Sequence, residues 1–141
     1  MRIYIATTLS NAPRAQALAE WLATHGAYVT YDWMSHGAQG HMGAGHLANI
    51  AAKELAGVAE ADAVIVLLPG GRGTHVEMGA ALALGKRVVI IDEPGGSLDV
   101  GPTTCSFYAL PQVCAVDGRF EDCDATLLDL LGIPGLVVPQ K

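Results

Sequence analysis

The strongest constraint on the fold of this chain is an uninterrupted apolar segment, AVIVLLP, at residues 63–69. A strand without alternating polar residues is typical of a parallel sheet that helices cover on both faces. Other short segments rich in β-formers are RIYIA (2–6), RVVII (87–91) and VCAV (113–116). The sequence therefore predicts several strands that are buried from both sides.

Amphipathic or small-residue segments separate these strands and predict the helices. They cover residues 13–26, 46–62, about 74–85 and 121–132, while AYVTYDW (27–33) adds a further strand. On the second predicted helix the apolar side consists of Leu47, Ile50, Leu55 and Val58. Strands that alternate with helices in this way predict an α/β fold with right-handed crossovers between parallel strands.

Five such strands predict a doubly wound parallel sheet of the flavodoxin or Rossmann type, with strand order 2-1-3-4-5. The length of 141 residues fits one domain, residues 1–141. Ligands of such sheets bind outside the carboxyl ends of the strands. The functional residues are therefore expected in four loops: TTLSN (7–11), DWMSHG (32–37), PGGRGTHVE (69–77) and DEPGG (92–96).

The charge of the chain excludes several classes of partner. Its formal net charge is -6, whereas nucleic acids and membrane surfaces are bound through basic patches. No apolar segment reaches the ~18 residues of a membrane span. The three cysteines lack C-x-x-C spacing and predict free thiols in a reducing compartment. We therefore expect a cytoplasmic protein whose partner is a small molecule.

Glu77 is a single acid near the start of an apolar predicted helix. One interpretation is functional: the helix dipole lowers the pKa of the carboxyl group, which then serves as a nucleophile or stabilises a cation. The other is structural, because Thr74 and Glu77 have the T-x-x-E spacing of a capping box. The residues alone leave both interpretations open.

Several sharper motifs are absent around Glu77. The segment GGRGTH lacks the lysine of a phosphate-binding loop, and Val76 occupies the place of the third glycine in G-x-G-x-x-G. His75 and Glu77 are two residues apart on a helix and diverge, so they do not form a metal pair. His36, His41 and His46 recur every five residues, which is a rare spacing for zinc ligands. We expect no metal and no cofactor, and a loop that folds over a ligand instead.

Aromatic residues of the first two strands allow two interpretations each. Trp33 and Tyr31 can stack on a planar ligand or complete the core. Tyr4 is either a core tyrosine or a hydrogen-bond donor to a carboxylate in the cleft. In the adjoining loops the candidate ligand contacts are Thr7, Thr8, Gly71, Arg72, Gly73 and His75.

Three segments resemble the nucleoside 2-deoxyribosyltransferase superfamily, which includes the 2'-deoxynucleoside 5'-phosphate N-hydrolases. They are IYIA in the first strand, KELAGVAEADAVIVLLP, and GTHVEMGAALALGKRVVI. The resemblance implies cleavage of an N-glycosidic bond, with Glu77 in the position of the nucleophile. It places Glu54 where the family has a second acid, usually aspartate, and Tyr4 where a tyrosine hydrogen-bonds the nucleophile.

The sequence also departs from that family. Glu54 is one methylene longer than the family's aspartate. Gly71 stands where the transferases carry an acid near the leaving base, which leaves protonation of the base unassigned. His75 replaces a common glycine, and it either fills part of the pocket or touches the ligand.

Arg72 and Arg14 are candidates to bind a 5'-phosphate, which would favour a nucleotide over a free nucleoside. The predicted reaction transfers the sugar to a second base or to water. Two alternatives remain: a nucleotide-binding or sensing module without turnover, and an NAD glycohydrolase. The apolar content of 51% and the long loop 92–112 favour a homo-oligomer, a dimer or larger.

Overall fold

A five-stranded parallel sheet forms the centre of the molecule. The computed structural model describes residues 1–36 and 43–135, with only the backbone at residue 36. The sheet has the order β2-β1-β3-β4-β5, and every neighbouring pair is parallel. Its strands are β1 (Arg2–Ala6), β2 (Tyr28–Val29), β3 (Ala63–Leu68), β4 (Arg87–Asp92) and β5 (Val113–Asp117). The predicted fold class and strand order are confirmed.

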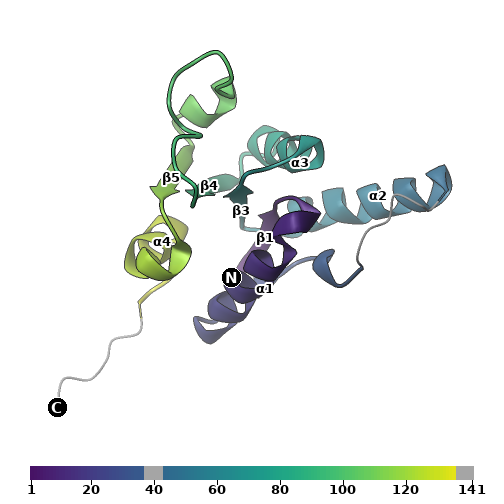
Figure 1. Ribbon diagram of the computed structural model, residues 1–141. Helices are drawn as coiled ribbons and strands as arrows, with labels where there is room; N and C mark the ends of the chain where they lie inside the picture. The colour runs from purple at the N-terminus through teal and green to yellow at the C-terminus, as the bar shows by residue number, and fades with distance from the viewer. Residues whose placement is uncertain (37–42, 136–141) are drawn as a thin grey trace.

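Helices cover both faces of this sheet (Figure 1). Side chains alternate along β1, so Ile3 and Ile5 join one core while Tyr4 and Ala6 join the other. The first core includes residues of α1 (Ala12–Thr24) and α4 (Asp124–Leu131). The second includes residues of α2 (Ala44–Glu60) and α3 (Arg72–Ala83). Short 3-10 segments lie at Leu9–Asn11, Met34–His36, Ser106–Ala109 and Phe120–Asp122.

Element boundaries differ from the sequence predictions by a few residues, and two of these differences affect the site. The strand expected at 27–33 is β2, only Tyr28–Val29, because the chain then leaves the sheet edge. Beyond β2, the Thr30 hydroxyl donates to the Gly57 carbonyl at 2.7 Å and the Trp33 indole N–H donates to the Ile5 carbonyl at 2.8 Å. The helix expected from about residue 74 is α3, which begins at Arg72. The three cysteines are free, as predicted.

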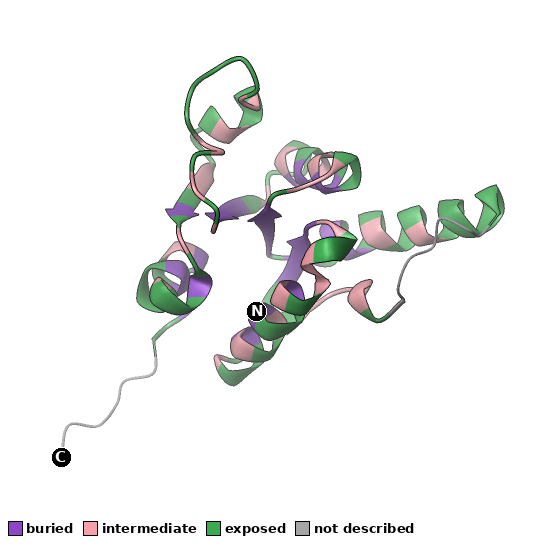
Figure 2. Ribbon diagram, viewed as in Figure 1, coloured by how far each residue is buried: buried purple, intermediate pink, exposed green. Residues whose placement is uncertain are grey.

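Helix α2 is far less buried than its apolar side predicts. Only Gly57 and Val58 are buried in it, while Leu47 and Leu55 are 43% and 46% exposed. Of the predicted apolar side, only Val58 is therefore buried in the core. The helix extends away from the sheet, and most of its length is exposed or half-buried (Figure 2). Helix α2 is thus held to the rest of the molecule mainly at the C-terminal end of the helix.

Gly57 is the point where α2 lies closest to β1. A Cβ atom there would lie 2.9 Å from Tyr31 Cβ and 3.0 Å from Tyr4 Cδ2. We expect Gly57→Ala to lower the free energy of unfolding by about 1–3 kcal/mol, because neither neighbour can shift freely. Gly79→Ala on α3 is the matched control, since a Cβ there meets nothing within 4 Å. It should raise stability by about 0.5–1 kcal/mol.

Urea unfolding of the two variants and the wild type measures this difference. Equal unfolding free energies for the two alanine variants would show that the space around Gly57 is not restrictive.

Candidate active site

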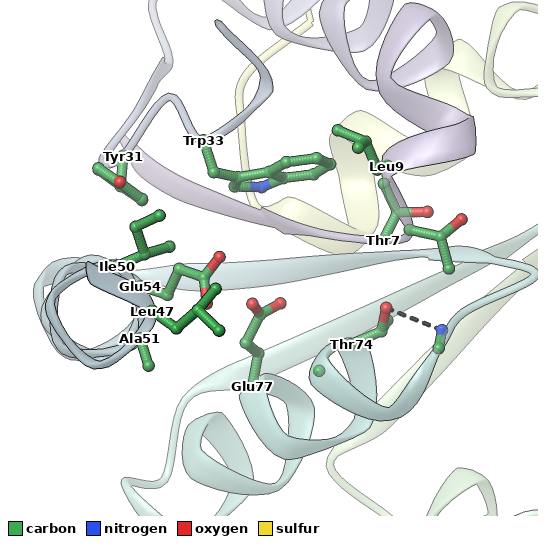
Figure 3. Close-up of a pocket in the computed structure, with 13 residues that line it drawn as sticks. Thr7, Leu9, Tyr31, Trp33, Leu47, Ile50, Ala51, Glu54, Thr74 and Glu77 are labelled. Carbon is green, nitrogen blue, oxygen red and sulfur yellow. Dashed lines mark hydrogen bonds between the residues drawn. The ribbon is translucent and has the colours of Figure 1, made fainter. Parts of the chain in front are cut away.

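A pocket of about 400 Å³ opens at the carboxyl edge of the sheet, beside the ends of β1 and β3. Strand order reverses between these two strands, which is where ligands of doubly wound sheets bind. Residues that follow β1, residues of α2 and the first turns of α3 form its walls (Figure 3). The lining residues are Thr7, Thr8, Leu9, Tyr31, Trp33, Leu47, Ile50, Ala51, Glu54, Gly71, Gly73, Thr74 and Glu77.

Glu77 lies in the second turn of α3 and points into this pocket (Figure 3). It is only 8% exposed. Burial, and then the charge of Glu54, raise the pKa of Glu77 to about 8, while the Tyr4 hydroxyl opposes the shift. The predicted low pKa is therefore wrong. Because α3 begins at Arg72, Glu77 is too far along the helix for its free amides to outweigh the loss of hydration.

The capping-box interpretation of Glu77 is also wrong. Thr74 occupies the third helical position, and its hydroxyl accepts a hydrogen bond from the Gly71 amide at 3.1 Å. Gly71 is the residue that caps the helix. Glu77 lies about one turn further along the helix, so capping of the helix N-terminus does not explain why an acid is buried at this position.

Glu54 and Tyr4 converge on Glu77 from two other elements. Glu54 lies on α2 and lines the pocket, and burial raises its pKa. Tyr4 lies in β1 and is fully buried. Burial, and then the Glu77 and Glu54 carboxylates, raise the pKa of the Tyr4 phenol well above its usual range. Its hydroxyl approaches Glu77 without reaching full hydrogen-bond geometry with any described partner. The three predicted residues therefore form one interacting cluster.

Thr7, Thr8 and Trp33, which were predicted to contact the ligand, line the pocket. The Thr7 hydroxyl donates to the Leu67 carbonyl at 2.7 Å, which ties the end of β1 to β3. The Trp33 ring lies across the pocket from Glu77 (Figure 3), held by its bond to the Ile5 carbonyl. The interpretation of Trp33 as a pocket residue is thus supported, although its indole N–H is committed to the backbone.

The apolar side of the pocket was predicted only in part, at Tyr31. It also includes Leu9 and a stripe of α2, formed by Leu47, Ile50 and Ala51, which were not predicted as part of the site. These three residues and Glu54 follow one another at helical spacings of three, one and three, so they share one side of α2. An apolar stripe that ends in an acid was the available sequence signal for this wall.

The glycine turn before α3 forms the opposite wall. Gly71, Gly73 and Thr74 line the pocket there. A Cβ atom on Gly71 would lie 3.2 Å from the Thr8 methyl group, so the turn and the loop after β1 are in close contact. The first backbone N–H groups of a helix have no partner within the helix, so this wall is suited to hydrogen-bond acceptors.

Arg72 and His75 do not line the pocket, although both were predicted to bind the ligand. The Arg72 side chain is exposed. The His75 ring has Nδ1 at 2.7 Å from the Gly71 carbonyl oxygen and Nε2 at 2.7 Å from the Tyr108 hydroxyl. Arg14 is likewise engaged, with Nε at 2.6 Å from a Glu93 carboxylate oxygen.

Metal binding finds no support in the part of the chain that the structure describes. No cluster of three or more potential ligands occurs among those residues. His41 and the side chain of His36 lie outside them, so the histidine spacing noted in the sequence is not tested. Over the same residues, no helix is long and apolar enough to cross a bilayer.

Comparisons with known proteins show the family and the fold of the chain. A family model described as nucleoside 2-deoxyribosyltransferase matches residues 3–129. No curated protein matches the sequence. The structure is similar to that of a CMP N-glycosidase, BcmB, from Clostridium botulinum, with a TM-score of 0.60 and 21% identity. That similarity covers 92% of this chain and 99% of the other, and it shows a shared fold. Because the family model spans most of its length, the chain belongs to the nucleoside 2-deoxyribosyltransferase family.

Proposed function

We propose that this protein cleaves the N-glycosidic bond of a nucleoside or nucleoside 5'-monophosphate, with Glu77 as the nucleophile. The observation that carries the proposal is a buried carboxyl group in the pocket at the strand-order reversal, which interacts electrostatically with a second acid and a buried tyrosine. A carboxylate in such a place can attack the anomeric carbon or stabilise an oxocarbenium-like charge.

The reaction needs two displacements at the same carbon. The ionised Glu77 oxygen bonds to C1' of the sugar while the bond to the base breaks and its electron pair leaves with the base. Water or a second base then attacks C1' and releases the Glu77 carboxylate, with loss of a proton from the attacking group. Tyr4 orients the Glu77 oxygen, and Glu54 holds the sugar hydroxyls or assists the departing base.

The positions of the arginines bear on the 5'-group of the substrate. Arg14 is paired with Glu93, and Arg72 is exposed away from the lining. A phosphate would therefore rely on the amides of the α3 turn rather than on a cationic side chain. This arrangement favours a free nucleoside as the substrate. The amides could still bind the phosphate of a nucleoside 5'-monophosphate, so the proposal includes both.

The test is base release from matched ribo- and deoxyribonucleosides and their 5'-monophosphates, followed by chromatography of the free base. We expect release from at least one class, and a second added base will distinguish transfer from hydrolysis. Absence of release across the whole set, together with tight binding of a nucleotide, would instead indicate a sensing module. Incubation with NAD and assay of free nicotinamide covers the glycohydrolase alternative.

His75 is expected to position the glycine turn for this reaction. Its Nδ1–H donates to the Gly71 carbonyl, so the Tyr108 hydroxyl donates to Nε2. We expect Tyr108→Phe to raise KM by about threefold and to change kcat by less than about twofold, because it loosens a wall without altering Glu77. Steady-state kinetics measures the split, and Phe107→Tyr, at an exposed neighbouring position, is the control. A loss confined to kcat would contradict this role.

We also propose that the protein forms a homo-oligomer through α2. Leu55 on α2 and Val76 on the adjacent α3 are large apolar side chains outside the pocket lining that are 46% and 64% exposed. A second copy is the occupant that fits, because a twofold axis brings the Leu55 side of α2 against itself. Sedimentation equilibrium should give a multiple of the chain mass, and Leu55→Asp should give the monomer. A monomeric wild type would overturn the proposal.

A further inference from the structure

The ionisable side chains of the pocket are unbalanced in charge. Glu54 and Glu77 both line it, and no lysine, arginine or histidine does so among the residues that the structure describes. The cations nearest in sequence to the site loops are engaged or lie elsewhere: Arg14 pairs with Glu93, and Arg72 is exposed outside the lining. Among the described residues, two acids therefore share the pocket lining without a positively charged side chain.

This imbalance has a direct effect on the nucleophile. The charge of Glu54 adds to burial in raising the pKa of Glu77, so the protonated and unreactive form is favoured in the empty pocket. A positive charge on the ligand next to Glu77 would favour the ionised form. A negative charge at the same place would do the opposite.

Two hydrogen-bond donors of the pocket lining offer little help to a neutral leaving base. A neutral base that departs with the bonding electron pair must gain a proton, whereas a cationic base leaves as a neutral molecule. The Thr7 hydroxyl donates to the Leu67 carbonyl at 2.7 Å and the Trp33 indole N–H donates to the Ile5 carbonyl at 2.8 Å, so both donors are committed. Gly71, in the turn next to the pocket, has no side chain to supply a proton.

The wall across from the acids also suits a flat cation. Trp33 and Tyr31 line the pocket, and Figure 3 shows the Trp33 ring across from Glu77 and Glu54. The face of an indole ring attracts a cation, and the attraction grows where water is excluded. A planar cationic base would lie between this ring and the two carboxyl groups.

We propose that the pocket selects N-glycosides whose base carries a formal positive charge, such as pyridinium nucleosides and N7-alkylated purine nucleosides. This inference rests on the proposed N-glycosidic cleavage and specifies its substrate class. The Glu77 oxygen bonds to C1' as the bond to the cationic base breaks. The electron pair goes to the ring nitrogen and neutralises the base, so no proton donor is required. Water then displaces Glu77 from C1' and one proton passes to solvent.

Matched substrates that differ in charge test this selection. The pair is 7-methylguanosine and guanosine at pH 6, where the methylated base is cationic, with nicotinamide riboside and cytidine as a second pair. Each kcat/KM is divided by the spontaneous hydrolysis rate of the same compound, since cationic bases leave more readily without an enzyme. We expect this ratio to be at least about tenfold larger for the cationic member of each pair.

A second measurement removes the chemical step. Inhibition by the 1-methylnicotinamide cation and by neutral nicotinamide compares the two charges on nearly the same ring, and the cation should bind at least about fivefold more tightly. Glu54→Gln should reduce the preference for cationic substrates by about tenfold. The control Glu60→Gln changes an exposed acid of the same helix that lies outside the pocket, and it should keep the preference.

The outcomes separate the two proposals. Cleavage of the neutral nucleosides with an equal or smaller ratio for the cationic ones would overturn the charge selection and leave the N-glycosidic cleavage intact. A preference that Glu54→Gln leaves unchanged would also overturn it. Failure to cleave any member of either pair or of the wider panel would overturn the proposed function itself.

Discussion

Glu77→Gln is expected to lower kcat/KM for base release by at least about 10³-fold. The amide keeps the size and polarity of the side chain, but it cannot form the glycosyl bond or carry the negative charge that stabilises an oxocarbenium-like sugar. Glu77 is buried in the pocket, so solvent does not replace that charge. Initial rates on the best substrate of the panel, for wild type and variant, give the ratio.

Glu60→Gln serves as the matched control for this loss. Glu60 is an exposed acid at the end of α2, outside the pocket lining, so its variant should retain the wild-type rate. A Glu77→Gln protein that keeps more than about one tenth of the wild-type kcat/KM would exclude Glu77 as the nucleophile.

The same substitution is expected to stabilise the fold at alkaline pH. The pKa of Glu77 is raised from 4.5 to about 8, so the folded state binds a proton that the unfolded chain releases between these values. This contribution to stability is complete below about pH 4.5 and is lost as the pH rises through about 8. A glutamine side chain does not titrate. The free energy of unfolding of the variant should therefore exceed that of the wild type by about 2–4 kcal/mol at about pH 8.5, and by far less at about pH 5.

Thermal unfolding at the two pH values measures this effect. For a chain of this length the difference in Tm between variant and wild type should grow by on the order of 10 °C from about pH 5 to about pH 8.5. Glu54 is present in both proteins, so its own titration largely cancels in the comparison. A Tm difference that stays constant with pH would show that Glu77 titrates near its ordinary value.

The sheet and its strand order could be predicted because they follow from local patterns. The fully apolar β3 (Ala63–Leu68) and the regular alternation with helices leave few arrangements for a parallel sheet. The position of Glu77 after the glycine turn likewise placed it at the carboxyl edge. Its pKa could not be predicted, since that depends on where α3 begins and on how closely Glu54 approaches from α2.

The directions of the Arg72 and His75 side chains could not be predicted from the sequence. Each of the two residues is next to a pocket residue at the start of α3. A shift of the helix start by two residues would therefore change which of the two side chains faces the pocket. The partner of His75 is Tyr108, which is 33 positions further along the chain. A contact of that range depends on how the loop after β4 folds back, and no periodicity encodes it.

Because α2 is packed closely against β1 at Gly57, a tilt of the helix about this point would move its residues by unequal distances. Leu47 lies about 15 Å from Gly57 along the helix axis, whereas Glu54 lies only about 4.5 Å from it. A tilt of about 10° around Gly57 would therefore shift Leu47 by about 2.6 Å and Glu54 by about 0.8 Å. Under the proposed function, such a tilt would change the width of the far end of the pocket for the base while the spacing of the two acids is nearly preserved.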